Sequence, residues 1–461
     1  MLSKGFDAAA NELLYAPRPA YGDVKSSLGI ADLGPQPPPN SEGVVAYADA
    51  KRNQLRSMSI WWLDQMVVQD HPFHERMTWF WHGHWATSYI KVDEPVVMFD
   101  HINRLRQHAA GNFSQMCEQM VLDGALIYWL DGELNTASAP NENLARELME
   151  LFILGVNRYS EQDVKEAAKV LSGWKVVKSS GIVYQNPRQS FGGNSTVLGV
   201  NDRFDAVKLA RFLAEQPSAQ RFIPERLWYR FASSEAALPS DGVIEGMFAG
   251  REILPTMASL VYSMAYADAS HAVVKSPLEW LVGVLRALQI TPSSYSNPDN
   301  LLGRLTNLGQ RPLYPPNVGG WPADEAWLSV ASAQTRINTA QTLASRADLG
   351  HVTALATGSR VDALADWLGV EMHERHGVWI AQAVDWETGR LSKPPPFPLT
   401  ESIYGGSRVE ARGKPGDGRS PVGGFSDGSY GAAAARFRRR PMTRIAKAAR
   451  APTATIRAER C

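Results

Sequence analysis

The sequence predicts a mostly α-helical protein: one large multi-helix domain, a small β-hairpin or loop insertion and a disordered C-terminal tail. Apolar residues recur at three- and four-residue steps through most of residues 53–345, as they do on the buried face of a helix. A stretch rich in Gly, Asn and Ser at 179–199 interrupts this pattern. After Trp386 the chain turns to Gly, Pro and Arg with almost no apolar periodicity, so it cannot bury enough surface to offset the entropy of ordering.

The composition is that of a globular protein and excludes several classes. Hydrophobic residues make up 44% of the chain and charged residues 20%. The formal net charge of +0 is a cancellation, because residues 391–461 hold 14 Lys and Arg against 5 Asp and Glu, while residues 1–390 hold 33 against 42. We therefore expect no nucleic-acid binding by the main domain. No apolar run approaches the length of a membrane span, and Cys117 and Cys461 cannot form a disulfide framework.

Three regions follow one another along the chain. Residues 1–50 are a Pro- and Gly-rich leading segment with one short helix near 6–14, and residues 51–370 are the helical domain. Residues 391–461 are a basic low-complexity tail, for which a frameshifted reading frame and a functional anion-binding segment are the alternatives to simple disorder. Helical patterns within the domain cover 55–68, 96–110, 113–130, 205–215, 219–231, 255–266, 277–288 and 327–345.

Two helices have the clearest signals at their ends. Residues 142–154 carry an apolar stripe and are followed by Gly155, the residue type that most often ends a helix. Residues 161–171 follow Ser160, and Asp163 three positions later completes a capping-box pattern. After them, a short apolar run at 181–184 within the Gly/Asn/Ser-rich stretch predicts a small hairpin or a long loop.

The segment WFWHGHW at 79–85 places two histidines among aromatic residues. Imidazole is a common ligand for zinc, iron or copper, so His82 and His84 are candidate ligands of a divalent metal. On a regular helix, residues two apart point in widely different directions, so joint ligation requires Gly83 to break the helix. The alternative is that both histidines are hydrogen-bonded within an aromatic core.

The helix at 142–154 carries a second set of candidate residues. Glu147 and Glu150 would act as metal ligands or as acid and base if they face inward, and Arg146 would orient them. Carboxylates that project inward beside histidines form the metal sites of helical bundles. The alternative is a solvated helix, in which Glu142 and Arg146 form an ordinary pair four residues apart.

Two further motifs are weaker candidates. The Pro- and Gly-rich stretch at 309–327 displays Tyr314, Asn317 and Trp321 on a rigid connection, which suits either ligand binding or the capping of a helical core. His373 and His376 have metal spacing but lie where the domain pattern fades. The chain has no phosphate-binding loop, no dinucleotide glycine fingerprint, no G-x-S-x-G and no H-E-x-x-H.

Four segments together resemble the bacterial family known as domain of unknown function 1800. They are HPFHERMTWFWHGHWATS at 71–88, PNENLARELMELF at 140–152, VKSPLEWLVGVLRAL at 274–288 and GQRPLYPPNVGGWP at 309–322. The resemblance covers about residues 6–340 and implies a helical fold without an agreed activity. It also implies a partner, because genes of this family often lie beside those of a sulfatase-like family.

The chain departs from the family pattern in two places. Many members carry a His-Asp pair and then a Lys where this chain has Ser190, Phe191 and Ser195, so any site built on those positions is lost or altered. Members are often exported, whereas the N-terminus as written has no apolar signal region and predicts a cytoplasmic protein, or an exported one if the true start lies upstream.

The leading functional hypothesis from the sequence is a metal-dependent enzyme that acts on a polymeric or envelope-associated substrate. His82 and His84 would bind the metal, Glu147 or Glu150 would be a ligand or the general base, and Arg146 would position the carboxylates. The alternative is a non-catalytic scaffold or binding protein that works with a partner enzyme, in which the tryptophan-rich segment is core.

Overall fold

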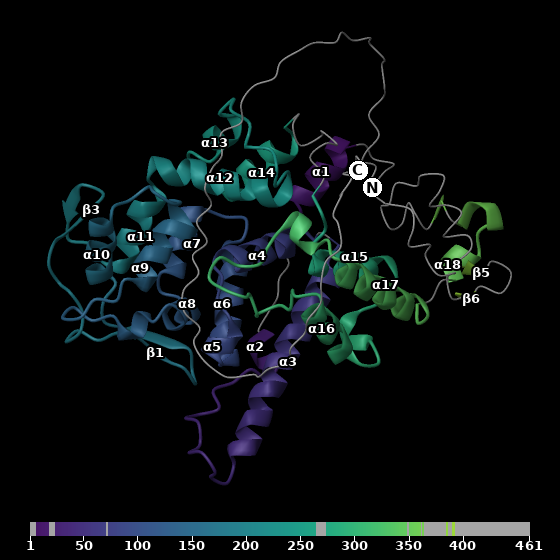
Figure 1. Ribbon diagram of the computed structural model, residues 1–461, viewed down its shortest axis with the longest axis horizontal. Coiled ribbons are helices and arrows are strands. Elements are labelled where there is room, and N and C mark those ends of the chain that lie inside the picture. The colour runs from purple at the N-terminus through teal and green to yellow at the C-terminus, as the bar shows by residue number, and fades with distance from the viewer. Residues whose placement is uncertain are drawn as a thin grey trace, which may run out of the picture. The chain divides into compact units, whose positions relative to one another are not determined.

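The structure is a computed structural model that describes residues 6–17, 24–70, 72–263, 273–347, 350–360, 362–363, 384–385 and 390–391. Within these residues the protein is mostly α-helical with a few two-stranded sheets, so the predicted fold class is confirmed (Figure 1). None of the helices in this part of the chain is long and apolar enough to cross a bilayer. The predicted tail and the His373–His376 pair lie outside the described residues, apart from Leu391, which ends a short strand.

The first helices build the centre of the domain. Helix α3 begins at Val44, inside the predicted leading segment, and buries Leu55, Met58, Trp62 and Met66 at three- and four-residue steps. This spacing places them on the side of α3 that packs against α6 and α15. The elements of this part are α1 (Phe6–Leu14), α2 (Val24–Ser27), α3 (Val44–Val68), α4 (Phe73–His84), α5 (Tyr89–Val92) and α6 (Pro95–His108).

The next part confirms the predicted helix ends and divides two of the predicted helices. Ser160 and Asp163 form the predicted capping box, and Asp123 caps a new helix within the single one predicted at 113–130. The helix predicted at 142–154 changes at Leu148 from α to a wider π-helical turn. The elements are α7 (Phe113–Met120), α8 (Gly124–Trp129), η2 (Gly132–Leu134), α9 (Asn143–Glu147), the π-helix η3 (Leu148–Ile153) and α10 (Glu161–Val170).

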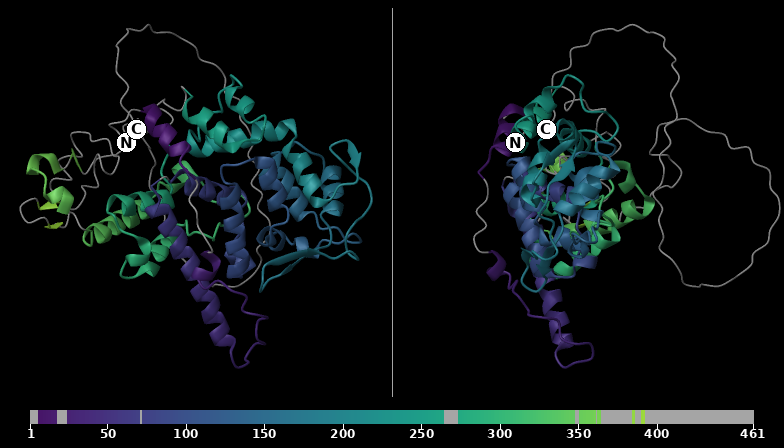
Figure 2. Two further views of the ribbon diagram at one scale, coloured as in Figure 1. Left: turned by 180° about the vertical axis from the view of Figure 1, so that it is seen from behind. Right: turned by 90° about the vertical axis from the view of Figure 1, so that its left-hand side faces the viewer.

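The predicted insertion consists of two antiparallel hairpins. Strand β1 (Trp174–Val177) pairs with β2 (Ile182–Gln185), and β3 (Ser195–Val197) pairs with β4 (Val200–Asp202). Strand β3 packs against α10 and β1 packs against α8, and Figure 2 shows this part of the protein from two further sides. A third pair, β5 (Val384–Asp385) with β6 (Arg390–Leu391), lies near the end of the described residues.

The remaining helices pack against several of the earlier ones. Helix α11 packs against α7, and α15 and α16 pack against α3. The elements are α11 (Ala206–Ala214), α12 (Pro217–Phe231), α13 (Val243–Met247), α14 (Ile253–Val261), α15 (Pro277–Ala287), η5 (Pro292–Ser294), α16 (Pro298–Asn307), η6 (Asp324–Trp327), α17 (Val330–Ala344), α18 (Gly350–Thr353) and η7 (Thr357–Ser359).

A buried ion pair joins α4 to α6 inside this core. Arg106 Nε donates to Glu75 Oε1 at 2.8 Å and its Nη2 donates to Oε2 at 3.1 Å, while Trp62 Nε1 also donates to Oε2 at 2.9 Å. The side chains of the pair are 0% and 2% exposed. Both oxygens of the carboxylate therefore have partners, as a charge removed from water requires.

Candidate functional site

Helix α4 carries both candidate histidines in its last turn, and it stays helical through Gly83. The backbone N–H of Trp85 still donates to the carbonyl oxygen of Trp81, at 2.7 Å, so no turn is lost at the glycine. The break that joint ligation by His82 and His84 requires is therefore not found. The two imidazoles leave the helix in different directions and contact different parts of the chain.

His82 is fully buried and receives a hydrogen bond from a distant loop. Its Nε2 accepts from the backbone N–H of Leu313, at 3.3 Å, and its ring lies 5.3 Å from that of Trp321 and 5.9 Å from that of Trp79. Burial lowers the pKa of His82 far below its usual value, and the neighbouring His101 lowers the pKa further. We therefore expect a neutral imidazole that joins the loop to the core.

His84 is also buried, on another side of α4. Its Nε2 donates to the carbonyl oxygen of Phe152 in the π-helix, at 2.8 Å, and its ring stacks against Phe80. Burial lowers the pKa of His84 to about 3, with a smaller contribution from the positive charge of Arg226. The neutral side chain of His84 thus connects α4 to the backbone of η3.

One ring nitrogen of each histidine is engaged by the backbone, while both Nδ1 atoms are buried without a hydrogen-bond partner among the described residues. The Nε2 atom of His82 accepts one backbone hydrogen bond and that of His84 donates another, so neither of these atoms is free to bind a metal. Metal sites in proteins usually combine three or four ligands from His, Cys, Asp and Glu. Within the described part of the chain, no group of three or more such residues is arranged to hold a metal ion.

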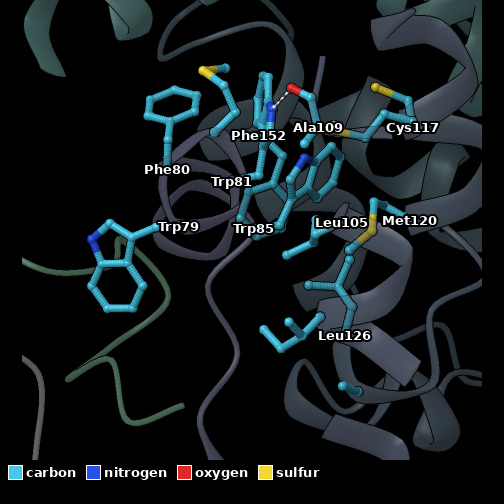
Figure 3. Packing of buried hydrophobic residues seen from close by; sticks show 14 of the residues in the cluster. Trp79, Phe80, Trp81, Trp85, Leu105, Ala109, Cys117, Met120, Leu126 and Phe152 are labelled. Atoms are coloured by element: carbon cyan, nitrogen blue, oxygen red, sulfur yellow. Dashed lines mark hydrogen bonds between the residues drawn. The ribbon is translucent and has the colours of Figure 1, made fainter. Parts of the chain in front are cut away.

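The loop at 309–322 covers this face of α4, so of the two alternatives for this stretch the capping of the core is the one found. Trp321 stacks on Trp79 with ring centroids 4.6 Å apart, and both side chains are buried. Figure 3 shows Trp79 pointing away from Trp81 and Trp85, which pack among Leu105, Cys117 and Met120. A Cβ atom on Gly320 would lie 2.1 Å from the carbonyl oxygen of Gly83. Gly83 therefore lies at a very close approach of two backbones within an unbroken helix.

Arg146 lies at the surface and joins two helices. Its Nη2 donates to Glu142, at 2.9 Å, and two of its nitrogens donate to the two carboxylate oxygens of Glu161, each at 2.7 Å. Its side chain is 32% exposed. Arg146 therefore holds the start of α10 against α9, and its hydrogen bonds go to Glu142 and Glu161 rather than to Glu147 or Glu150. The Glu142–Arg146 pair expected of a solvated helix is present.

Glu147 and Glu150 flank the change from α9 to the π-helix. Tyr159 Oη donates to Glu150 Oε2 at 2.5 Å. Burial raises the pKa of Glu147, the charge of Glu150 raises it further, and Arg146 opposes both effects. A partly exposed carboxyl group with a raised pKa beside a second carboxylate is an arrangement that acid–base enzymes use, and π-helical turns are frequent at functional sites.

The altered family positions do not form a polar site in this chain. Ser195 is buried, and its hydroxyl donates to Glu166 Oε2 at 2.7 Å. Ser190 lies against Gly173, where φ is +85°. Phe191 donates its backbone N–H to the hydroxyl of Ser172. These contacts hold the hairpin insertion against α10, so the positions serve local structure here.

The sequence patterns did not single out two arginines of α12, of which Arg226 lies near His84. Arg226 and Arg230 lie one turn apart on α12, and neither has an ion pair within the described residues. The signal available from the sequence is weak, because only the spacing of two cations on a predicted helix marks them.

The comparisons with known proteins identify a family but no individual relative. No curated protein and no solved structure matches the chain. A family model described as protein of unknown function (DUF1800) matches residues 3–395, beyond the 6–340 that the motifs alone indicate. The match includes α4, the Glu147–Glu150 segment and the 309–322 loop. The chain therefore belongs to the DUF1800 family.

Proposed function

We propose that the protein is a non-catalytic binding protein or scaffold, and that the tryptophan-rich segment of α4 is its structural centre. The observation that carries this proposal is the burial of His82 and His84, each with a backbone hydrogen bond to a segment far away in the sequence. Such contacts organise a core, whereas catalytic histidines must reach a substrate or its water.

A binding role also needs a surface for a partner. Around hairpin β1–β2, four apolar side chains are strongly exposed: Leu134 68%, Val177 42%, Ile182 59% and Tyr184 50%. Clustered exposed apolar residues are typical of surfaces that proteins use to contact one another. A sulfatase-like enzyme is the partner that the family resemblance suggests. We propose to test it by gel filtration of the two purified proteins, in which co-elution supports the pairing and separate elution contradicts it.

We expect His82→Ala to lower the free energy of unfolding by about 2–4 kcal/mol, because it opens a cavity and leaves the Leu313 N–H without an acceptor. His82→Gln keeps an amide oxygen as an acceptor and should lose markedly less. Denaturant unfolding of the two variants beside wild type measures both values. Unchanged stability in His82→Ala, together with the loss of an activity that wild type possesses, would contradict the structural role.

The second candidate is an acid–base enzyme that acts on a polymeric or envelope-associated substrate. The observation in its favour is Glu147, whose raised pKa, neighbouring Glu150 and place beside a π-helical turn suit a general acid or base. In this candidate Glu147 exchanges the proton, and Tyr159 holds Glu150 in place through its hydrogen bond. Arg146 has an indirect role, because it orders the adjoining helix.

We expect Glu147→Gln to raise the melting temperature at pH 7 by about 1–3 °C and to leave it unchanged at pH 4. Because its pKa is raised in the folded state, the folded protein binds the proton more tightly than the unfolded chain does, so ionisation above the usual Glu range destabilises the fold. Selection for function tolerates such a residue, whereas selection for stability alone would not.

Glu161→Gln is the matched control for this experiment. Its hydrogen bonds from Arg146 lower the pKa of Glu161, so its charge favours the fold and the variant should lose stability at pH 7. Differential scanning fluorimetry of both variants at the two pH values shows whether their melting temperatures change in opposite directions. If Glu147→Gln is also destabilised at pH 7, Glu147 is an ordinary stabilising carboxylate and the acid–base candidate loses its support.

A further inference from the structure

Helix α12 directs two arginines toward α4 and the 309–322 loop. Phe222, Arg226 and Arg230 recur every four residues along α12, and therefore lie on one face of the helix. Phe222 at one end of this face contacts the ring of His84, with centroids 6.2 Å apart. Arg230 at the other end donates to the carbonyl oxygen of Pro322. The face thus lies against the segment that forms the centre of the fold.

Neither arginine has the partners that a guanidinium group in such surroundings needs. Arg226 makes no hydrogen bond and no ion pair with any described residue, although its Nε is shielded from solvent. Its guanidinium carbon lies 5.7 Å from the centre of the Tyr229 ring. Arg230 makes a single long hydrogen bond, 3.4 Å, to Pro322. A guanidinium group offers five N–H donors, so most of these are left over.

The carboxylate whose charge acts on Arg230, that of Glu279, is already engaged. Glu279 accepts from the backbone N–H of Ser276 at 3.0 Å and pairs with Arg76 at 3.2 Å, within the described residues. Arg76 also lies over the ring of Phe231, on the last turn of α12. Arg76 pairs with this carboxylate and Arg230 feels its charge, whereas no carboxylate of the described residues pairs with Arg226.

Without a bound anion, this arrangement of arginines is electrostatically unfavourable. Burial lowers the pKa of Arg226 and of Arg230. The charge of Arg230 lowers the pKa of Arg226 further, whereas Glu279 partly opposes the effect at Arg230. Both side chains nevertheless remain partly exposed, so a ligand from solvent can reach them. A charge that is largely desolvated and unpaired is stabilised most strongly by an anion of opposite charge.

We propose that Arg226 and Arg230, with Arg76 at the edge, bind an oxyanion group of the sulfate or phosphate class, free or carried as an ester on a larger molecule. Guanidinium groups bind such oxygens through paired hydrogen bonds, and a doubly charged anion matches the two unpaired cations. Two or three arginines are too few for a nucleic-acid backbone. The site goes beyond the proposed binding role and does not depend on it, because it uses different residues.

Isothermal titration of the full chain with sodium sulfate, with sodium phosphate and with methyl phosphate, at constant ionic strength, tests the proposal. Wild type should bind one ion per chain, and Arg226→Gln and Arg230→Gln should each weaken binding by about tenfold or more. Arg221→Gln is the matched control: it removes an equal charge from the same helix, but Arg221 already pairs with Glu225, so binding should persist.

The melting temperature in the presence and absence of sulfate provides a second readout. Sulfate should raise it for wild type and for Arg221→Gln but not for Arg226→Gln, whose own stability without sulfate should equal or exceed that of wild type. If Arg230→Gln does not fold, Arg230→Lys keeps the charge without the fork and should bind more weakly than wild type. Binding of methyl phosphate as tight as that of inorganic phosphate supports an ester as the natural source, and weaker binding supports the free ion. Absence of sulfate and phosphate binding by folded wild type, or equal loss in Arg221→Gln, would overturn the site.

Discussion

Gly320→Ala is expected to destabilise the protein by at least about 3 kcal/mol, among the largest effects of a single methyl group. The added Cβ would lie 2.1 Å from the carbonyl oxygen of Gly83, a backbone atom that cannot move without shifting α4. The φ angle of +81° at Gly320 is itself unfavourable for alanine. The loop at 309–322 would therefore lift from α4, and the Trp79–Trp321 stack and the hydrogen bond to His82 would be lost with it.

Gly199→Ala separates the cost of the steric clash at Gly320 from the cost of the positive φ angle. Gly199 has a φ of +79°, nearly that of Gly320, but no atom lies within 4 Å of the position of its added Cβ. Alanine there should cost about 1–2 kcal/mol, the penalty of a left-handed conformation alone. Denaturant unfolding of both variants gives the comparison. Equal losses in the two would mean that the loop does not approach α4 as closely as the structure has it.

Glu75→Ala is expected to lower the free energy of unfolding by about 3–5 kcal/mol. The substitution removes the carboxylate that accepts from both Arg106 and Trp62, and it leaves the positive charge of Arg106 inside the core. The double variant Glu75→Leu/Arg106→Met removes both charges and should recover much of the loss, because apolar residues of similar volume often replace a buried pair without penalty.

Arg146→Ala provides the surface counterpart. Arg146 has the same kind of two-pronged pairing with Glu161, but its side chain is 32% exposed, so we expect a loss of no more than about 1 kcal/mol. Thermal and urea unfolding of the three variants beside wild type give the order of their losses in stability. A Glu75→Ala loss no larger than that of Arg146→Ala would contradict the burial of the Glu75–Arg106 pair.

Local features of the sequence predicted most of the helices and their ends. The capping box of Ser160 and Asp163 is present, and Gly155 and Gly173 have the positive φ angles that follow their helices, 91° and 85°. These signals act within a few residues, so the sequence alone displays them. The division of the helix at Leu148 was not predicted, because the apolar stripe at 142–154 fits an α-helix and a π-helical turn almost equally well.

The candidate site could be predicted only in part, because its contacts are distant in sequence. The H-x-H pattern drew attention to His82 and His84, but their hydrogen-bond partners, Leu313 and Phe152, are 231 and 68 residues away. Gly83 suggests a break in the helix, whereas the helix is unbroken and the close approach of the loop instead requires the glycine at position 320. Such reasons appear only when the fold brings the segments together.

Elemental analysis combined with thermal unfolding tests the central claim, that the histidines of α4 organise the core. The protein is purified without a histidine tag and compared with His82→Ala/His84→Ala. We predict no stoichiometric metal in the wild-type chain and a clearly lower melting temperature in the double variant, because two buried hydrogen bonds and their packing are lost. About one metal ion per wild-type chain, lost in a double variant that keeps its melting temperature, would contradict the account.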